Sequence, residues 1–257
     1  MAIIVKGLSF GYGENTILHE LDFSVPAGKF TAVLGKNGSG KSTLLRLIAG
    51  FIKPQSGSIE VSGVDVNSLS ATERAKGIGF LPQSHSPVFP FTVEEVVLTG
   101  RAAYIFSTPT RKDREKAENA IGRIGIEDLR KRPYTELSGG ERQLVLIARV
   151  LAQEPKIMLL DEPLSGLDLS NQAKMLNLLK GLVASGLTVV AVLHDPNVAF
   201  RYGDHFLFLK NGMIREPEEL NGVLNPQVLT DVYGIKIEMV PFRNRFLVVS
   251  DPDGIEG

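Results

Sequence analysis

Continuous apolar runs, separated by amphipathic or glycine-rich stretches, recur through much of the chain. Runs of this kind are typical of strands that are buried on both faces of a parallel sheet. They occupy Phe30–Leu34, Gly77–Leu81, Lys156–Leu160, Leu187–Leu193 and His205–Leu209. Helical patterns such as Leu44–Gly50 and Ser170–Ala184 follow some of these runs. The alternation of buried strands and helices predicts a parallel α/β core.

The N-terminal part of the chain carries a shorter β pattern. Ile3–Val5 and Leu21–Val25 predict antiparallel strands on either side of a turn at Gly11–Asn15. Ser58–Ser62 predicts a further β segment after the first helix. Together these stretches indicate a small antiparallel β subdomain at the N-terminus.

The pattern becomes mostly helical between about residues 84 and 152. Thr92–Glu95 matches a capping box and predicts a helix that runs through about Arg101. A charged helix is expected over 110–124, and an apolar helix over Leu144–Ala152. The region 84–152 is therefore predicted to be a helical insertion between two β-rich halves.

The last part of the chain has weaker signals. Asn225–Tyr233 is a helix candidate, and Ile235–Val240 with Arg245–Val249 is a possible strand pair. We expect residues 221–257 to form a short C-terminal extension of a single domain that spans residues 1–220.

Composition narrows the class of protein. The chain has 257 residues and is 43% apolar, which is enough to bury a sizeable core. Its net charge of −1 argues against nucleic acid as a partner, because nucleic-acid-binding proteins usually carry a basic excess. The absence of cysteine excludes a disulfide framework and a thiolate metal site.

Neither a signal peptide nor a membrane span is predicted. Met1–Lys6 lacks the basic start and the long apolar run of a signal peptide. No window approaches the roughly 20 uninterrupted apolar residues that are needed to cross a bilayer. A protein of this kind would therefore serve a membrane only from its surface.

The stretch Gly35–Thr43 fits the pattern G-x-x-x-x-G-K-[ST] between a strand pattern and a helix pattern. In a P-loop the glycines let backbone N–H groups face phosphate oxygens, and the new helix points its positive end at them. Lys41 is placed for the β- and γ-phosphates and Ser42 for Mg²⁺. The alternative is a turn without chemistry, which the flanking strand and helix disfavour. The residues expected to bind nucleotide are Gly35, Asn37, Gly38, Ser39, Gly40, Lys41, Ser42 and Thr43.

Two carboxylates directly follow the apolar run at Ile157–Leu160. Asp161, at the end of a buried strand beside a P-loop, is placed to hold Mg²⁺. Glu162 is placed to orient or deprotonate an attacking water molecule. A charged pair that merely ends a strand is the alternative, and the P-loop upstream makes it the weaker interpretation.

A second helix start lies in Leu137–Gln143. Ser138 is expected to cap this helix, with Glu141 closing a capping box. A serine followed by Gly139 and Gly140 at a helix N-terminus also makes an anion site. One chain would then carry two phosphate-binding helix starts, which could meet at one nucleotide if two copies joined head to tail.

Together these motifs resemble those of ATP-binding-cassette (ABC) ATPases over about residues 3–215. Gly35–Thr43 resembles the Walker A motif of that family, Ile157–Glu162 the Walker B motif, and Leu137–Gln143 the signature motif. The other matches are Gln83 for the Q-loop, Ser165–Asp168 for the D-loop, His194 for the switch histidine and Tyr12 for the aromatic residue that stacks on adenine. The resemblance implies a P-loop core with a mixed sheet, an antiparallel β subdomain and a helical insertion.

The resemblance also implies a role for each residue. Glu162 would act as general base, His194 would contact the γ-phosphate, and Gln83 would contact Mg²⁺ and the attacking water. Ser42, Gln83 and Asp161 would then be the metal-binding side chains. The remaining nucleotide-binding residues would be Tyr12, Ser138, Gly139, Gly140 and Asp168, with Ser138 and its neighbours closing on the ATP of the partner subunit.

Two of these matches have plain alternatives. A single histidine after a strand, such as His194, is more often structural, and only its place in the full set of motifs favours catalysis. Tyr12 could simply pack a turn, and Phe10 is a nearby competitor for stacking on adenine.

Three roles follow from the resemblance. The first is the ATPase subunit of an importer, bound to separate permease subunits at the cytoplasmic face of the membrane and served indirectly by a substrate-binding protein. Phe91–Arg101 is similar to importers of iron chelates, haem and cobalamin, a type shared by oxyanion importers such as those for molybdate. This segment would lie in the helical subdomain that receives the coupling helix of the permease. The second role is a soluble cassette ATPase, for example in iron–sulfur cluster assembly. The third is a regulator that binds ATP without hydrolysis, against which the intact Glu162 and His194 argue.

Overall fold

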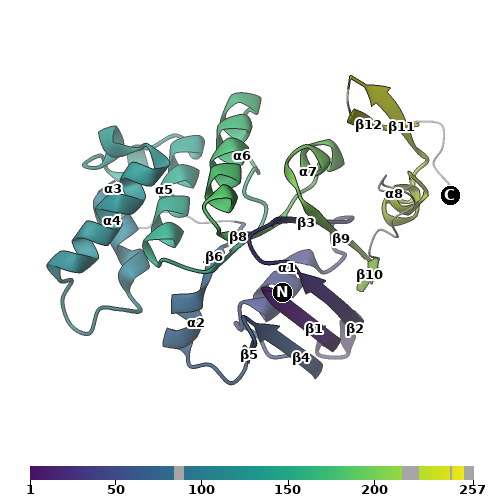
Figure 1. Ribbon diagram of the computed structural model, residues 1–257, viewed down its shortest axis with the longest axis horizontal. Helices are drawn as coiled ribbons and strands as arrows, with labels where there is room; N and C mark the ends of the chain where they lie inside the picture. Colours follow the sequence, from purple (N-terminus) through teal and green to yellow (C-terminus); the bar gives the residue numbers. More distant parts are fainter. Residues whose placement is uncertain (84–89, 216–225, 244, 252–257) are drawn as a thin grey trace.

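A computed structural model of the chain describes residues 1–83, 90–215, 226–243 and 245–251. Within this part of the chain, a six-stranded sheet in the order β10-β9-β3-β8-β7-β6 forms the centre of the molecule (Figure 1). Its strands are β3 (Phe30–Leu34), β6 (Ile78–Leu81), β7 (Ile157–Leu160), β8 (Thr188–Val192), β9 (His205–Lys210) and β10 (Met213–Arg215). All pair in parallel except β10, which turns back on β9 through a hairpin turn at Asn211 and Gly212.

The central strands are buried throughout because both faces of the sheet are covered. Every residue of β3, β7 and β8 is buried. Alternate residues face different cores: Met158 and Leu160 belong to the one that includes α6 (Leu169–Ala184) and α7 (Pro196–Tyr202). Ile157 and Leu159 belong to the core that includes α1 (Lys41–Ile48) and the antiparallel sheet. Burying a leucine or isoleucine completely stabilises the fold by about 1.5–3 kcal/mol, so continuous apolar runs are what such strands need.

The N-terminal subdomain is a four-stranded sheet in the order β2-β1-β4-β5 among the described residues. Its strands are β1 (Ile3–Tyr12), β2 (Asn15–Val25), β4 (Ser56–Val61) and β5 (Val64–Asp65). β1 and β2 are longer than predicted, because Gly11 and Tyr12 continue the strand and pair with Thr16 and Asn15. The turn predicted over Gly11–Asn15 is therefore shorter. Both strands extend past their apolar segments because of hydrogen bonds between them. The pattern of apolar residues does not indicate such hydrogen bonds.

The helical region forms a lobe beyond β6, at the left of Figure 1. Its elements are α3 (Val93–Leu98), the 3-10 turn η1 (Thr99–Arg101), α4 (Arg111–Ile124), η2 (Glu127–Leu129), η3 (Tyr134–Glu136) and α5 (Gly139–Ala152). Capping boxes at Thr92, Thr110 and Ser138 open the three α-helices, as the sequence predicts for Thr92 and Ser138. The first of these helices tightens into η1 before Arg101, and the apolar helix begins before Leu144. The first residues of the predicted insertion, 84–89, lie outside the described residues.

A buried arginine holds this lobe together. Arg101 is 3% exposed, and its Nε donates to Asp113 Oδ1 of α4 at 3.3 Å. Its Nη1 donates to the carbonyl oxygen of Ala152, the last residue of α5, at 2.8 Å and to Glu154 Oε2 at 3.1 Å. The guanidinium also stacks over the Tyr104 ring, 3.7 Å from its centroid. Because guanidinium donors are satisfied on several sides, the charge is tolerated where an unpaired one would be costly.

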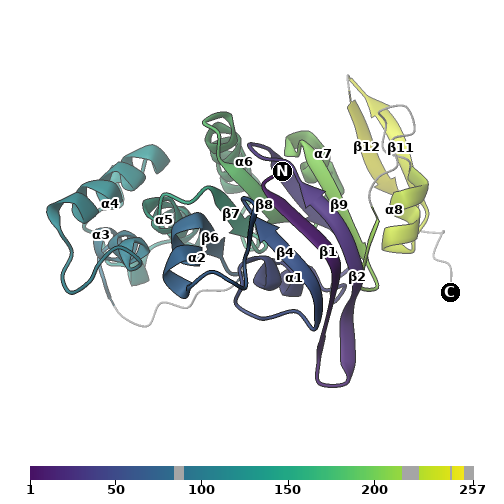
Figure 2. The same cartoon turned by 60° about the horizontal axis from the view of Figure 1, so that its bottom comes forward.

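The remaining helix of the N-terminal half, α2 (Ala71–Gly77), begins at a capping box formed by Ser70 and Glu73. At the other end of the chain, α8 (Pro226–Tyr233) precedes a hairpin of β11 (Ile237–Phe242) and β12 (Arg245–Ser250). This agrees with the predicted helix and strand pair, although β11 begins and ends two residues later than expected. Figure 2 shows this C-terminal segment at the right, on the side of the molecule opposite the helical lobe.

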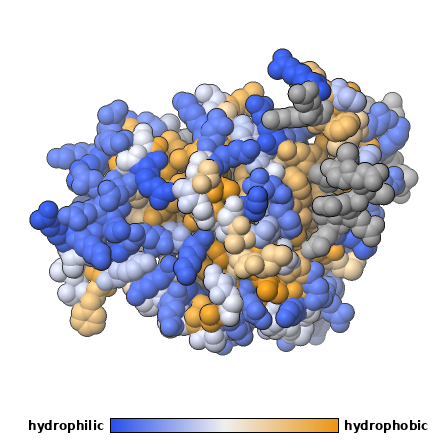
Figure 3. Space-filling model, in the orientation of Figure 1, coloured by the Kyte–Doolittle hydropathy of each residue, from blue (hydrophilic) through white to orange (hydrophobic). Residues whose placement is uncertain are grey.

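The surface is largely hydrophilic over the helical lobe (Figure 3), to which α4 contributes the charged run from Arg111 to Glu118. Every helix in the described part of the chain falls short of the length and apolar character needed to cross a membrane.

Gly100 tests the packing between η1 and α5. A Cβ at this position would lie 2.0 Å from the Arg149 carbonyl oxygen, which is backbone and cannot move aside easily. We expect Gly100→Ala to lower the free energy of unfolding by about 1–3 kcal/mol, measured from the midpoint of urea unfolding. Gly181→Ala is the matched control, because a Cβ on that exposed α6 glycine meets nothing within 4 Å. It should stabilise the protein by about 0.5–1 kcal/mol, and a Gly100→Ala protein as stable as the wild type would contradict the packing described.

Candidate functional site

The predicted P-loop leaves the carboxyl end of β3 and enters α1. Gly35, Gly38 and Gly40 have positive φ angles of 150°, 78° and 102°. A Cβ on Gly35 would lie 2.1 Å from the Leu209 carbonyl oxygen, and one on Gly40 would lie 2.7 Å from Leu18 Cδ2. Glycine is therefore required here both by backbone conformation and by the neighbouring β9 and β2.

The ammonium group of Lys41 lies inside the curve of this loop. Its Nζ donates to the carbonyl oxygens of Gly35 and Lys36 at 2.8 and 2.7 Å. Burial lowers the pKa of Lys41, and the carboxylates of Glu162 and Asp161 oppose this shift. A buried ammonium group held by neutral carbonyl oxygens can exchange them for phosphate oxygens, which form stronger, charge-assisted hydrogen bonds.

Unsatisfied polar groups at the loop fit a triphosphate. Ser39 Oγ is buried and has no hydrogen-bond partner, and such groups are uncommon in proteins. α1 starts at Lys41 with Gly40 as its N-cap, so no side chain caps the first backbone N–H groups of this helix. Both features are met by the oxygens of an anion bound at the helix N-terminus. Asn37 and Gly38 are exposed on the loop, and Thr43 is half-buried in the first turn of α1.

A hydroxyl and a carboxylate suitable for Mg²⁺ lie together beside the loop. Ser42 Oγ donates to Asp161 Oδ1 at 2.9 Å, and Asp161 is 2% exposed. Burial raises the pKa of Asp161, the Ser42 hydrogen bond lowers it, and Glu162 raises it further. A carboxylate with this tendency to take up a proton is stabilised in its ionised form by a cation. The residues thus fit Mg²⁺, which proteins usually bind through one or two carboxylates together with substrate phosphates.

Three predicted catalytic side chains meet at one atom. Glu162 Oε2 accepts a hydrogen bond from Gln83 Nε2 at 2.7 Å and lies 2.8 Å from His194 Nε2. The residues follow the carboxyl ends of β7, β6 and β8, which are neighbours in the sheet. Glu162 also has a φ of 52°, a left-handed conformation that costs a non-glycine residue about 1–3 kcal/mol and is concentrated at functional sites.

The structure separates the two candidates for stacking on adenine. Phe10 is 8% exposed and belongs to the core of the β subdomain, whereas Tyr12 is 50% exposed. Their rings are in an edge-to-face contact, with centroids 4.9 Å apart. Tyr12 therefore presents much more of its side chain to solvent than Phe10 does, which favours Tyr12 as the candidate for stacking on adenine.

The signature stretch lies apart from the P-loop of the same chain. Ser138 Oγ accepts from Glu141 N at 3.3 Å, and Glu141 Oε2 accepts from Ser138 N at 2.8 Å. These hydrogen bonds lower the pKa of Glu141. Ser138 and Gly139 are exposed at the start of α5, in the helical lobe, while α1 lies beneath the central sheet (Figure 1). The two predicted anion sites of one chain therefore lie in different parts of the fold.

The D-loop aspartate lies near the signature stretch, to which Asn171 connects it. Asp168 caps α6, accepting from Asn171 N at 2.8 Å and from Asn171 Nδ2 at 3.0 Å. The Asn171 side chain in turn lies against Gly140, where an added Cβ would be 2.9 Å from its Nδ2. Gln143 Nε2 donates to the Pro163 carbonyl oxygen at 3.1 Å, so α5 is also tied to the segment after Glu162.

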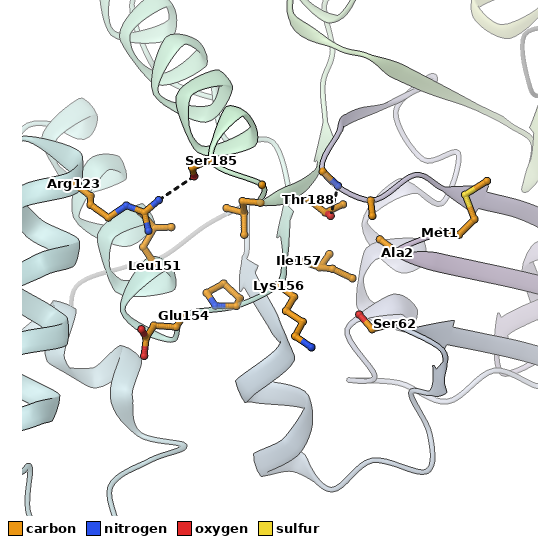
Figure 4. A pocket seen from close by; sticks show the side chains of 15 residues that line it. Met1, Ala2, Ser62, Arg123, Leu151, Glu154, Lys156, Ile157, Ser185 and Thr188 are labelled. Carbon is orange, nitrogen blue, oxygen red and sulfur yellow. Dashed lines mark hydrogen bonds between the residues drawn. The ribbon is translucent and has the colours of Figure 1, made fainter.

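A pocket of about 610 Å³ lies at the opposite ends of the parallel strands from the predicted site (Figure 4). Lys156 and Thr188 lie at the beginning of β7 and β8, so this pocket is at the amino ends of the parallel strands. None of the predicted site residues lines it. Ligands of open α/β sheets bind at the carboxyl ends of the strands, where the predicted residues are.

Two residues near the site segments, in α8 and α7, were not predicted from the sequence. Tyr233 of α8 is half-buried with its hydroxyl enclosed, and Asn197 of α7 binds the backbone of β12. Neither lies in a motif, and no spacing or composition signal marks them. They are found only because the C-terminal segment folds back onto the core.

The comparisons with known proteins agree with this geometry. The family model for ABC transporters matches residues 18–165. The chain therefore belongs to the ABC transporter family, as an ATP-binding subunit that hydrolyses ATP to power transport.

Two relatives illustrate the branch of the family. The hemin import ATP-binding protein HmuV of Pseudomonas entomophila is 37% identical over 94% of this chain and 96% of its own length. The ferric enterobactin transport ATP-binding protein FepC of Escherichia coli is 37% identical over 95% of this chain and 88% of its own length.

Solved structures confirm the predicted fold. An inward-facing ABC transporter of the metal-chelate type aligns with a TM-score of 0.84 and 36% identity, covering 98% of this chain and 97% of that one. A dimeric ATP-binding cassette in a post-hydrolysis state, bound to ADP and Pi, aligns with a TM-score of 0.74 and 32% identity. That alignment covers 86% of this chain and 100% of the cassette.

Proposed function

We propose that this protein is the ATPase of an importer that takes up a metal chelate through separate permease subunits. The observation that carries the ATPase part is the meeting of Gln83 and His194 on Glu162 beside the P-loop. The chelate part is supported by the similarity to the hemin and ferric enterobactin transport proteins and to the metal-chelate transporter. Because these relatives are named for transport, the soluble iron–sulfur alternative is not favoured. No relative described above favours an oxyanion such as molybdate.

Each residue of the nucleotide site then has a defined task. Lys41 leaves the carbonyl oxygens of its own loop for the β- and γ-phosphates, while the loop N–H groups and Ser39 satisfy the remaining phosphate oxygens. Ser42, Asp161 and Gln83 hold Mg²⁺, which when bound neutralises phosphate charge. Tyr12 stacks on the adenine from its exposed face.

Hydrolysis is assigned to the cluster around Glu162. Its carboxylate accepts a proton from the attacking water as the water oxygen bonds to the γ-phosphorus and the bond to ADP breaks. His194 and Gln83 hold this carboxylate in place from neighbouring strands. Gln83 also connects it with the chain that continues toward the helical lobe, so the catalytic carboxylate can respond to a movement of that lobe.

The site is completed by a second copy of the chain. The exposed start of α5, with Ser138, Gly139 and Gly140, offers backbone N–H groups and a hydroxyl that its own P-loop does not use. In a head-to-tail homodimer this surface covers the γ-phosphate bound by the partner, and Asp168 lies beside the same contact. The dimeric state of the related cassette with ADP and Pi supports this arrangement.

A groove between the core and the helical lobe suits a permease helix. It has a volume of about 300 Å³ and is lined by α2, η1, the end of α5 and the aromatic pair Phe51 and Phe80. Phe51 is 63% exposed and packs edge to face on Phe80, with ring centroids 4.9 Å apart. Apolar grooves of this kind receive amphipathic helices, and the predicted Phe91–Arg101 segment forms part of the adjoining lobe. The assembly would lie at the cytoplasmic face of the membrane and receive cargo from a substrate-binding protein.

The same proposal covers the domain limits. Residues 1–220 form one ABC ATPase domain, with a helical insertion at 84–152 and an extension at 221–257. The extension contributes buried residues to the main core, which distinguishes it from a freely hanging tail.

Glu162→Gln tests the general base. The amide cannot accept the proton of the attacking water, so the rate of ATP hydrolysis should fall by about 10²–10⁴-fold. Because closure no longer ends in hydrolysis, the ATP-bound dimer should accumulate, as measured by light scattering after size-exclusion chromatography. Glu60→Gln, on β4, serves as the control and should hydrolyse ATP normally. Normal turnover by Glu162→Gln would show that another residue is the base.

Ser138→Arg tests the contribution of the partner subunit. The large cation should prevent closure of the dimer, so hydrolysis is lost, while binding of ATP to the monomer keeps its wild-type Kd. Ser107→Arg, an exposed serine in the same lobe, should leave both properties unchanged. Loss of ATP binding in Ser138→Arg would instead point to misfolding of α5, whose N-cap costs about 0.5–2 kcal/mol to remove.

Phe51→Asp tests the permease groove and the transport role together. The chain is co-purified with its membrane partner, and ATP-dependent uptake of a ferric siderophore into vesicles is measured. The charged substitution should weaken binding to the permease by at least about 10-fold, as expected for an aromatic interface anchor. The ATP Kd of the isolated chain should not change. Val64→Asp, at an exposed position on β5, is the control. A soluble scaffold as the only partner, or normal uptake by Phe51→Asp, would contradict the proposal.

A further inference from the structure

The β11–β12 hairpin has one apolar face that remains exposed. Val240 pairs with Leu247 across the two strands, Glu238 pairs with Val249, and Phe242 follows Val240 by two residues. Because residues alternate between the two faces of a strand, these five residues share one face, which we call the outer face of the hairpin. Its four apolar side chains are between 39% and 52% exposed.

The opposite face of the hairpin is used within the chain. Ile237 is buried in the main core, and Val248 packs against that core. Asn197 Oδ1 accepts from Val248 N at 2.7 Å, and Asn197 Nδ2 donates to the Val248 carbonyl oxygen at 3.1 Å. The backbone groups with which another strand could pair at Val248 are therefore already bound. The hairpin is held in place by its inner face and by this edge, and its outer face is the part left open to a partner.

The size of the outer face limits what it can do. Contiguous exposed apolar patches with charged residues around them are typical of sites of protein association. Two strands of six residues cover roughly 20 Å by 10 Å, which is about 200 Å² in each copy. Two such faces would bury about 400 Å² in total, well below the roughly 1,200 Å² of a stable interface. The outer face can thus add to a larger contact but cannot replace one.

The head-to-tail homodimer offers such a larger contact near the hairpin. Its two-fold axis exchanges the two copies, so it passes between the P-loop and the signature stretch of each chain. In the order β10-β9-β3-β8-β7-β6, with the helical lobe beyond β6, the ends of β8 and β7 lie between these two sites. α7 begins two residues after His194, which follows β8, and Asn197 binds the hairpin to the first turn of α7. The hairpin is therefore attached beside the segments closest to the axis (Figure 1).

Charge distinguishes the two ends of the outer face. Glu238 lies at the base of the hairpin, and Arg243 lies at its tip, with its guanidinium carbon 5.4 Å from the centroid of the Phe242 ring. Glu238 pairs with Lys236 at 3.3 Å, but both side chains are more than half exposed, so this ion pair is weak and can be exchanged. Two faces that pack base on tip bring Glu238 of each copy toward Arg243 of the other. Packing tip on tip would bring two arginines together.

We propose that the outer face of the hairpin packs, base on tip, on the same face of a second copy and so strengthens the homodimer that ATP closes. The inference rests on the head-to-tail dimer of the proposed function. A contact between identical patches must be self-complementary, and the apolar centre with opposite charges at its two ends meets this requirement. Because this contact lies outside the nucleotide surfaces, it keeps the two subunits close when those surfaces separate.

Val240→Asp tests the apolar contact in the Glu162→Gln background, in which the ATP-bound dimer accumulates. The Kd of the dimer, measured by sedimentation equilibrium with ATP and Mg²⁺, should rise by at least about 10-fold, because a carboxylate is then placed at the centre of the interface. Val64→Asp is the matched control, since Val64 on β5 is 45% exposed and Val240 is 44% exposed. It should leave the Kd of the dimer unchanged. Both variants should bind ATP as monomers with the Kd of the parent protein.

Glu238→Arg and Arg243→Glu test the base-on-tip arrangement, and they decide the matter if Val240→Asp lowers the Tm and so disturbs the hairpin itself. Each substitution alone brings like charges together between the copies and should raise the Kd of the dimer by about 3–10-fold. The double variant restores opposite charges, so its Kd should return to within about 2-fold of the parent value. A hairpin that had only become less stable would not be rescued by the second substitution.

The outcomes separate this inference from the proposed function. If Glu162→Gln forms no dimer with ATP, the head-to-tail dimer itself fails. If Glu162→Gln dimerises, a parent-like Kd for folded Val240→Asp, or a double charge reversal that gives no rescue, overturns the role of the hairpin alone. The inference is also overturned if Val240→Asp keeps the Kd of the dimer and instead loses binding to the permease or to phosphatidylglycerol vesicles, because the face then serves another partner.

Discussion

The neighbouring parallel strands of the central sheet have their carboxyl ends side by side. This constraint brings the predicted site residues of the protein together. β3 delivers the P-loop, β8 delivers His194, β7 delivers Asp161 and Glu162, and β6 leads to Gln83. Residues that are far apart in the chain become neighbours because the strands that precede them are hydrogen-bonded side by side. The continuous apolar runs of these strands matter for function in this sense, since their burial on both faces fixes the edge at which the polar residues meet.

The charged side chains of the site are arranged for a ligand that brings charges of its own. Lys41 and Asp161 are both buried, and burial shifts the pKa of each toward its neutral form. Each opposes the shift of the other only in part, so phosphate oxygens and a divalent cation would complete what the chain leaves unsatisfied. On the other side of the site, Glu162 is held by Gln83 and His194. A displacement of Gln83 in the Q-loop would therefore shift the Glu162 carboxylate, which is assigned to hydrolysis.

Much of the fold and most of the candidate site could be predicted from local patterns. Buried strands, capping boxes and glycines with positive φ depend on nearby residues, so the sequence predicted β7, the helix start at Ser138 and the P-loop well. The extent of β1 and β2 was underestimated, because hydrogen bonds between strands continue through Tyr12 where the apolar pattern stops. Asn197 could not have been found, because its partner Val248 is distant in sequence and the two residues meet through ordinary packing.

The sequence by itself determined the kinds of chemistry available: a loop with the P-loop pattern, a strand that ends in two carboxylates, and a second helix start that opens with a serine and two glycines. Each depends on residues within a few positions of one another. Only the tertiary structure decided which of these act together. It placed His194 and Gln83 on Glu162, left Ser138 exposed in the helical lobe, and packed α8 against β9. Such pairings follow from strand order and core packing, which join residues through space and leave no local pattern in the chain.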